Sequence, residues 1–252
     1  MKRVICLVPS LTETLLAAGV EVVGRTRYCI HPQKQVEKIP IVGGTKDIRW
    51  SLVTPLNADL LILDKEENPK RFAEQSPIPY VATHVTSVQN VGEQLEQLAL
   101  KLQSKELDSI SKRWRKVAEQ PGAAASGLEF WARFPGVLRW GQRPTSQVHR
   151  VLYMIWRDPW MAAGSRTFIG SVLHHLGVRG VPAWDENYPR LELESYLQPD
   201  TLLLFSSEPY DFAKQSEEWI KFPCASALVD GEMFSWFGLR SLQFLEESLD
   251  LK

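Results

Sequence analysis

Residues 3–24, RVICLVPSLTETLLAAGVEVVG, decide the fold because they have the pattern of a strand, a helix and a second strand in immediate succession. Arg3–Val8 is an apolar run of strand length, and Val20–Gly24 is another. Leu11–Ala18 between them has a helical pattern and would end at Gly19, since glycine commonly terminates helices. Successive strands connected by a helix predict a parallel sheet with right-handed crossovers.

The same alternation continues on both sides of a long central segment. In the first part of the chain, further strands are predicted at Ile39–Val42, Asp59–Leu63 and Pro79–Ala82. Beyond the central segment, the predicted strands are Val151–Trp156, Thr201–Phe205 and Ala225–Val229, and the predicted helices are Thr167–Leu176, Asp211–Ile220 and Leu239–Leu249. The halves also share a motif, because Asn57–Leu63 (NADLLIL) matches Gln198–Leu204 (QPDTLLL). We therefore expect two similar α/β lobes.

The central segment is predicted to be a single helix of roughly thirty residues. Between Ser87 and Glu119 apolar residues recur at helical spacing, and Gly92 is the only glycine. The predicted fold class is therefore α/β, with two Rossmann-like lobes that contain parallel sheets and are bridged by one long α-helix. The predicted domains are an N-terminal lobe at 1–86, the bridging helix at 87–120 and a C-terminal lobe at 121–252.

Composition argues against several classes of partner. The 252 residues are 44% hydrophobic and 23% charged, and 29 basic against 30 acidic residues give a net charge of −1. A neutral chain has no field that favours nucleic acid or an anionic membrane. No apolar run approaches the roughly 20 residues of a membrane span. The apolar run after Lys2 and Arg3 is too short for an export signal, so we expect a cytoplasmic protein, or a periplasmic one if a leader has been removed.

Several motifs together resemble the helical-backbone metal receptor superfamily, the class III periplasmic substrate-binding proteins. The motifs are LVPSLTE at 7–13, AAGV at 17–20, YCIHP at 28–32, IVGGTK at 41–46, DKEEN at 64–68, IWRDPWM at 155–161, SEPY at 207–210 and VDGEMFSW at 229–236. The resemblance implies two lobes bridged by a long helix, and a binding protein for cobalamin, haem or an iron–siderophore, with cobalamin receptors the most similar. Residues 120–149 match no part of this pattern.

The predicted ligand-binding residues share a position just after a predicted strand or on a loop of that edge. In open parallel sheets this edge is where ligands bind, and we expect a cleft between the two lobes. Flat aromatic side chains there suit a planar ring system, although core packing is the alternative for each of them. The predicted set is Tyr28, His31, Thr45, Lys46, His84, Trp156, Trp160, Tyr188, Tyr210, Met233 and Trp236.

Two loop histidines are candidates for an axial metal ligand. His31 and His84 both follow predicted strands, and a neutral imidazole suits cobalt and iron. Cys29 lies two residues before His31 and adds a second soft donor. The alternative is that each histidine is only hydrogen-bonded. The sequence has neither HExxH nor paired CxxC, so we predict no metal held by the protein itself.

Glu67 and Glu208 occupy equivalent places in the repeated motif, each eight residues after its aspartate. In the family that the motifs resemble, one acidic residue on each lobe meets arginines of an ABC permease. The resemblance therefore implies that these glutamates dock the permease if the protein is exported. The alternative is that each is a solvated loop charge.

The function expected from the sequence is reversible binding of a corrinoid or related metal chelate in the cleft, as a substrate-binding component or a cytoplasmic carrier. We expect no enzyme activity, no catalytic residues and no covalent cofactor; cobalamin or another metal chelate is the ligand. The first alternative is a metal chelatase-like enzyme acting on a tetrapyrrole, with His84 and either Glu66 or Glu67 as its acid–base pair. The second is an interaction module that has lost its ligand.

Overall fold

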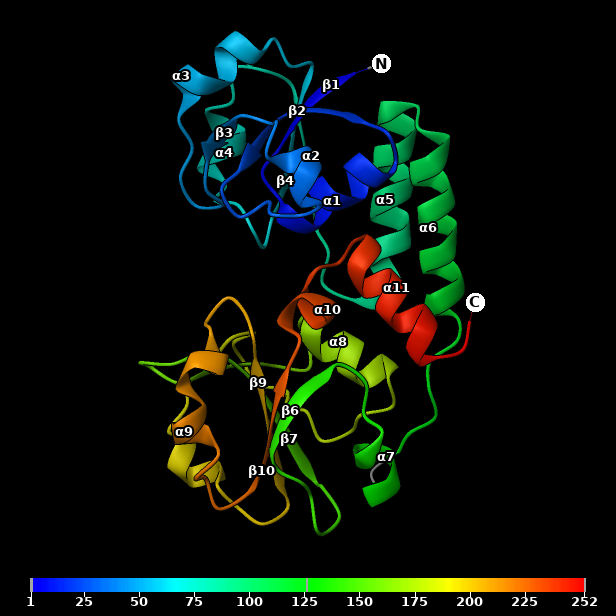
Figure 1. The fold of residues 1–252 in the computed structure, drawn as a ribbon. Helices are drawn as coiled ribbons and strands as arrows, with labels where there is room; N and C mark the ends of the chain where they lie inside the picture. Colours follow the sequence, from blue (N-terminus) through cyan, green and yellow to red (C-terminus); the bar gives the residue numbers. More distant parts are fainter. Residues whose placement is uncertain (1, 126, 252) are drawn as a thin grey trace. The chain divides into compact units, whose positions relative to one another are not determined.

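The computed structural model describes residues 2–125 and 127–251, and contacts divide the chain into two units (Figure 1). Unit 1 consists of the chain up to Val85, Gln89–Lys116 and Trp236–Leu242, and unit 2 consists of Thr86–Val88, Val117–Ser235 and the chain from Gln243. Most of the segment predicted as a bridge thus belongs to unit 1. The predicted domain boundaries stay a prediction.

Unit 1 is built on a parallel sheet, as predicted. Its strands are β1 (Arg3–Cys6), β2 (Glu21–Thr26), β3 (Ile41–Gly43), β4 (Leu60–Asp64) and β5 (Tyr80–Thr83), in the order β3-β2-β1-β4-β5. Every residue of β4 is buried, which explains its continuous apolar run. The short helices are α1 (Pro9–Ala17), α2 (Gln33–Val36), α3 (Trp50–Val53) and α4 (Arg71–Glu74). Gly19 has φ +69° just after α1, so the predicted helix end is confirmed.

The predicted single long helix is wrong. The segment forms two helices, α5 (Val88–Leu102) and α6 (Lys105–Ala118), which lie side by side in Figure 1. Gln103 breaks the helix with φ +55°, and the Ser104 hydroxyl accepts the backbone N–H of Leu107 (3.2 Å), which is a helix N-cap. Arg115 of α6 pairs with Glu96 of α5. No helix among the described residues is long and apolar enough to cross a membrane.

Unit 2 contains a mixed sheet whose centre is parallel. Its strands are β6 (Val137–Gln142), β7 (Arg150–Trp156), β8 (Met161–Ala163), β9 (Thr201–Ser206) and β10 (Ala225–Val229), in the order β6-β10-β9-β7-β8. The strands β10, β9 and β7 are parallel and were predicted, whereas the edge strands β6 and β8 are antiparallel and were not. The helices are α7 (Leu128–Ala132), α8 (Phe168–His175), α9 (Ser216–Trp219) and α10 (Gly231–Ser235), and α11 (Leu239–Ser248) begins in unit 1 and ends in unit 2. The helix predicted at Asp211–Ile220 is split between a 3-10 turn at Phe212–Gln215 and α9.

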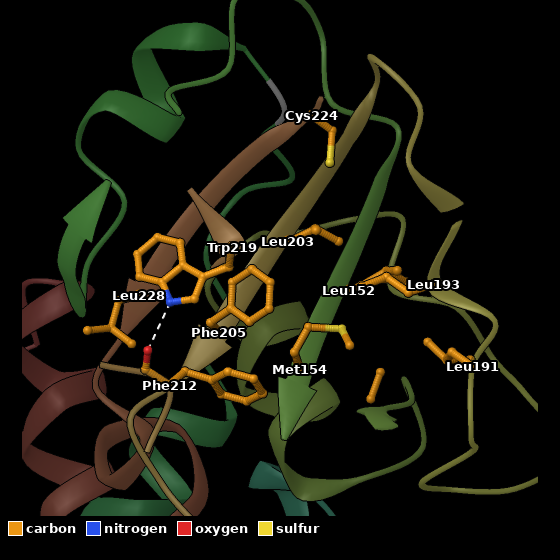
Figure 2. Packing of buried hydrophobic residues seen from close by; sticks show 11 residues of the cluster. Leu152, Met154, Leu191, Leu193, Leu203, Phe205, Phe212, Trp219, Cys224 and Leu228 are labelled. Atoms are coloured by element: carbon orange, nitrogen blue, oxygen red, sulfur yellow. Dashed lines mark hydrogen bonds between the residues drawn. The ribbon is translucent and has the colours of Figure 1, made fainter. Parts of the chain in front are cut away.

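The core of unit 2 is aromatic on the face of β9 that Figure 2 shows. Phe205 of β9 stacks on Trp219 with ring centroids 5.4 Å apart. The indole N–H of Trp219 donates to the carbonyl of Phe212 (2.9 Å), so the buried polar atom is paired. Aromatic pairs of this kind add to the stabilisation from burial.

Gly238 lets the C-terminal segment of unit 1 contact α1 closely. A Cβ at this position would lie 2.1 Å from the Thr14 hydroxyl oxygen and 2.6 Å from the Ser10 carbonyl oxygen. The same Thr14 hydroxyl accepts the backbone N–H of Leu239 (2.9 Å). Because the Ser10 carbonyl oxygen belongs to the backbone of α1, it cannot move aside for a Cβ, so only glycine fits at position 238.

We predict that Gly238→Ala lowers the free energy of unfolding by about 1–3 kcal/mol, the usual cost of overpacking. Chemical denaturation followed by circular dichroism measures this difference. Gly127→Ala is the matched control, because a Cβ at Gly127 meets nothing within 4 Å. Equal stabilities of the two variants would contradict the close contact.

His175 makes unit 2 sensitive to acid. Its side chain is fully buried, and its Nε2 lies 2.8 Å from the carbonyl oxygen of Val117. Burial is the main cause that lowers the pKa of His175, and the neighbouring His174 lowers it further. Burial therefore favours the neutral imidazole over the charged form in the folded state.

A histidine with a lowered pKa in the folded state contributes stability above its unfolded pKa of about 6.5, and this is lost as pH falls through the folded pKa. We predict that the free energy of unfolding decreases from pH 7 to pH 5, and that His175→Gln flattens this dependence. Denaturation series at several pH values measure the slope. The exposed His149 provides the control His149→Gln, which should keep the wild-type slope; a slope unchanged in His175→Gln would refute the assignment.

Candidate functional site

In unit 1 the predicted site residues lie on the loops that follow the strands at the carboxyl edge of the sheet. Tyr28 and His31 follow β2, Thr45 and Lys46 follow β3, Glu67 follows β4 and His84 follows β5. The parallel order brings these loops to one edge. Glu66, on the loop after β4, contacts the loops after β3 and β5. Its carbonyl oxygen accepts a hydrogen bond from Lys46 Nζ (3.2 Å), and its Oε1 lies 3.3 Å from His84 Nε2.

A buried carboxylate that sequence reasoning missed organises the same edge. Asp64 ends β4, is fully buried, and accepts the Thr83 hydroxyl at 2.7 Å. It also accepts the backbone N–H groups of Glu66 (2.9 Å) and Val85 (3.3 Å). Burial raises the pKa of Asp64, whereas these hydrogen bonds lower it.

Asn68 extends this arrangement to two more loops. Its Oδ1 accepts the backbone N–H of Asp64 (3.0 Å), and its Nδ2 donates to the carbonyls of Leu7 (3.2 Å) and Thr45 (3.0 Å). The loops after β1, β3, β4 and β5 are thus held by two neighbouring side chains. The sequence signal was only a polar residue at the end of an apolar strand, with an asparagine four residues later.

The loop after β2 presents one exposed ring and one buried thiol. Tyr28 is 53% exposed, and the Arg27 guanidinium lies 5.6 Å from its ring centroid. Cys29 is buried with its sulfur 3.2 Å from the Thr12 hydroxyl and 3.1 Å from that of Thr26. Burial raises the pKa of the Cys29 thiol, and the expectation of a second soft donor beside His31 stays a prediction.

His31 lies against Trp236 inside unit 1. The ring centroids are 5.5 Å apart at 66°, and Trp236 is only 8% exposed. Arg240 forms a bidentate pair with Glu13 (2.6 and 3.1 Å), and its guanidinium carbon lies 5.7 Å from the centroid of the Trp236 ring. Trp236 is thus packed between His31 and Arg240, and its role as a ligand contact stays a prediction. Among the described residues, no group of three or more His, Cys, Asp or Glu side chains could hold a metal ion.

In unit 2 the predicted aromatic residues have two different environments. Trp156 at the end of β7 is 42% exposed and contacts Tyr210 edge to face at 5.5 Å. Trp160 instead stacks on Phe212 with an interplanar angle of 5° and contacts Phe205, so this partly buried ring packs against the core. Its role as a ligand contact stays a prediction.

The remaining predicted residues of unit 2 are partly buried. Tyr188 lies in the segment before Pro189, and Met233 lies on α10. Glu208 is turned toward α10, where its Oε1 accepts the Ser235 hydroxyl (2.6 Å). Glu67, its counterpart in the repeated motif, is also partly buried, so neither glutamate is a fully solvated charge.

Comparison with known proteins identifies the fold. No family model matches the chain, and no curated protein matches it. Solved structures match along nearly the whole chain, although their sequences are very different. The periplasmic vitamin B12 binding protein BtuF of Vibrio cholerae is 16% identical with a TM-score of 0.69, and the match covers 99% of this chain and 95% of BtuF.

Two haem proteins match similarly well. The periplasmic haem-binding protein RhuT from Roseiflexus sp. RS-1 is 17% identical with a TM-score of 0.70, covering 98% of this chain and 95% of RhuT. IsdE of S. aureus, solved with haem, is 15% identical with a TM-score of 0.68, and the match covers 100% of this chain and 98% of IsdE. The chain therefore shares the fold of these vitamin B12- and haem-binding proteins.

Proposed function

We propose that this protein reversibly binds a metal chelate with a planar ring system, and that a corrinoid such as cobalamin is its ligand. The observation that carries the proposal is the match, over nearly the full length of both chains, to binding proteins for vitamin B12 and for haem. Both are described as binding proteins, which favours binding over the chelatase-like alternative.

The side chains of the loop edges support this ligand class. Tyr28 in unit 1 and Trp156 in unit 2 are exposed aromatic residues at strand ends, and each offers a flat apolar surface for a ring. Lys46 and Thr45 follow Gly44 on the loop after β3 and are suited to the polar rim of a macrocycle. Haem is the other candidate, because it presents the same combination of flat apolar face and polar rim.

His31 is the preferred axial ligand in this proposal. Its orientation is supported by the Trp236 ring, whose centroid lies 5.5 Å from that of the imidazole. A preorganised imidazole binds a metal at a lower entropic cost. Any metal would arrive with the chelate.

Delivery to an ABC permease is the proposed use of the bound chelate, with Glu67 and Glu208 as docking residues. BtuF and RhuT are described as periplasmic, which favours an extracytoplasmic receptor over a cytoplasmic carrier. Fractionation of cells that express the native gene distinguishes the two, because a receptor accumulates outside the inner membrane. Recovery in the cytosol alone would leave the carrier role and remove the permease.

Titration of the purified protein with cyanocobalamin, aquocobalamin and haem tests the ligand. We expect saturable one-to-one binding of a cobalamin, seen by absorbance and calorimetry. We also expect an added shift of the aquocobalamin band that His31→Ala abolishes and His84→Ala preserves. Binding of haem alone would transfer the proposal to haem, and binding of none of the three would refute it.

Trp156 and Trp160 should respond in opposite ways to truncation. Trp160→Ala removes a partly buried ring that stacks on Phe212 and should lower the free energy of unfolding by about 1–3 kcal/mol. Trp156→Ala is an exposed change, so its stability should stay within about 0.5 kcal/mol of wild type, while chelate affinity falls. Denaturation and the same titration measure both. A Trp160→Ala protein of wild-type stability that no longer binds would make Trp160 a ligand contact after all.

A further inference from the structure

The strongest unexplained feature is the buried Asp64 at the end of β4. A carboxylate in a buried position is costly unless hydrogen bonds compensate for the lost water. Its partners here are a hydroxyl and backbone N–H groups, from Thr83, Glu66 and Val85. The carboxylate therefore joins the chain after β4 to the chain after β5, besides filling a buried position.

Unit 2 shows the apolar solution at the equivalent position. The repeated motif aligns Asp59 with Asp200, which aligns Asp64 with Phe205. Phe205 is fully buried among apolar side chains. The loops after β9 and β10 are instead joined by the Ser207 hydroxyl, which accepts the backbone N–H of Gly231 (2.9 Å). At this aligned position the fully buried carboxylate is therefore particular to unit 1; Asp230, which follows β10 in unit 2, is only partly buried.

The hydrogen bonds of Asp64 and Asn68 reach the loops after β3 and β5, which carry the proposed ligand contacts Thr45, Lys46 and His84, and join them to the loops after β1 and β4. Asp64 binds the backbone of residues 66 and 85 beside His84, and Asn68 binds the carbonyl of Thr45. Outer contacts reinforce the same loops, because Arg71 donates to the carbonyl of Lys46 (2.7 Å). Residues far apart in the sequence are thus fixed to one another without any ligand.

We propose that Asp64 and Asn68 are positioning residues, which hold the loops after β1, β3, β4 and β5 in the arrangement that the chelate requires. The inference rests on the proposed function, because it treats these loops as the unit 1 part of the binding site. Loops ordered before binding lose less conformational entropy when the ligand arrives. The pair therefore determines affinity although neither side chain needs to contact the chelate.

Thr83 provides the sharpest test because its hydroxyl is removable without changing the side-chain shape. Thr83→Val deletes the donor to Asp64 and leaves a buried charge partly unpaired, whereas Thr83→Ser keeps the donor. We expect Thr83→Val to accelerate hydrogen exchange about tenfold at the amides of residues 66 and 85, in the ligand-free protein, and to weaken cobalamin or haem binding about tenfold. Thr83→Ser should restore both values.

Two further variants separate positioning from general stability. Asn68→Asp turns the amide donor toward Leu7 and Thr45 into an acceptor, so it should loosen the loop after β3. Asp59→Asn is the matched control, since Asp59 lies just before the other end of β4 and accepts the backbone N–H of Arg3 (2.8 Å). It should change neither loop exchange nor affinity. Denaturation curves give the free energy of unfolding of each variant. Variants with equal losses of stability but unequal losses of chelate affinity separate positioning from general stability.

The two readouts distinguish this inference from the proposed function. Faster exchange in the loops of Thr83→Val together with unchanged chelate affinity would overturn the positioning role. Unchanged exchange at the amides of residues 66 and 85 in this variant would overturn it as well. If the wild-type protein binds none of the chelates, the proposed function fails by itself. Exchange in the ligand-free variants then still decides the matter: acceleration confined to these loops supports the positioning role, and uniform acceleration over unit 1 overturns it.

Discussion

The hydrogen bonds of the Asp64 carboxylate are the constraint on which the carboxyl edge of unit 1 depends. Where parallel strands end inside the protein, backbone N–H groups lose their ladder partners and must find others. Asp64 supplies acceptors for the chain after β4 and after β5, and Asn68 joins the loop after β3. These hydrogen bonds hold the loops in fixed positions relative to one another. Lys46, Glu66 and His84 come close together as a result.

The two units build the carboxyl edges of their sheets by different physical means. Unit 1 uses buried polar side chains, which are strong and directional but costly if a partner is lost. Unit 2 uses an aromatic core around Phe205, on which the exposed ring of Trp156 is supported through Tyr210 and Phe212. The edge of unit 1 therefore offers polar contacts, and the edge of unit 2 offers a rigid apolar surface.

Sequence periodicity predicted what depends on local pattern. The parallel strands of both units and the helix end at Gly19 follow from apolar runs and one glycine. The break between α5 and α6 could not be found, because Gln103 and Ser104 are neither glycine nor proline, and the apolar spacing continues across them. Trp160 has the same sequence context as an exposed tryptophan, and only tertiary packing separates the two cases. The partners of Asn68 lie 61 and 23 residues away, beyond any local signal.

The discontinuity of the units has a consequence for how this protein evolves and how it is engineered. Trp236–Leu242 belongs to unit 1, although the chain before and after it belongs to unit 2. A recombination event that exchanged the second half of the gene would therefore also replace Trp236 and Arg240, the residues that support His31 and pair with Glu13. Chimaeras between relatives should keep both ends of the gene from one parent, and crossovers are best placed in pairs rather than singly.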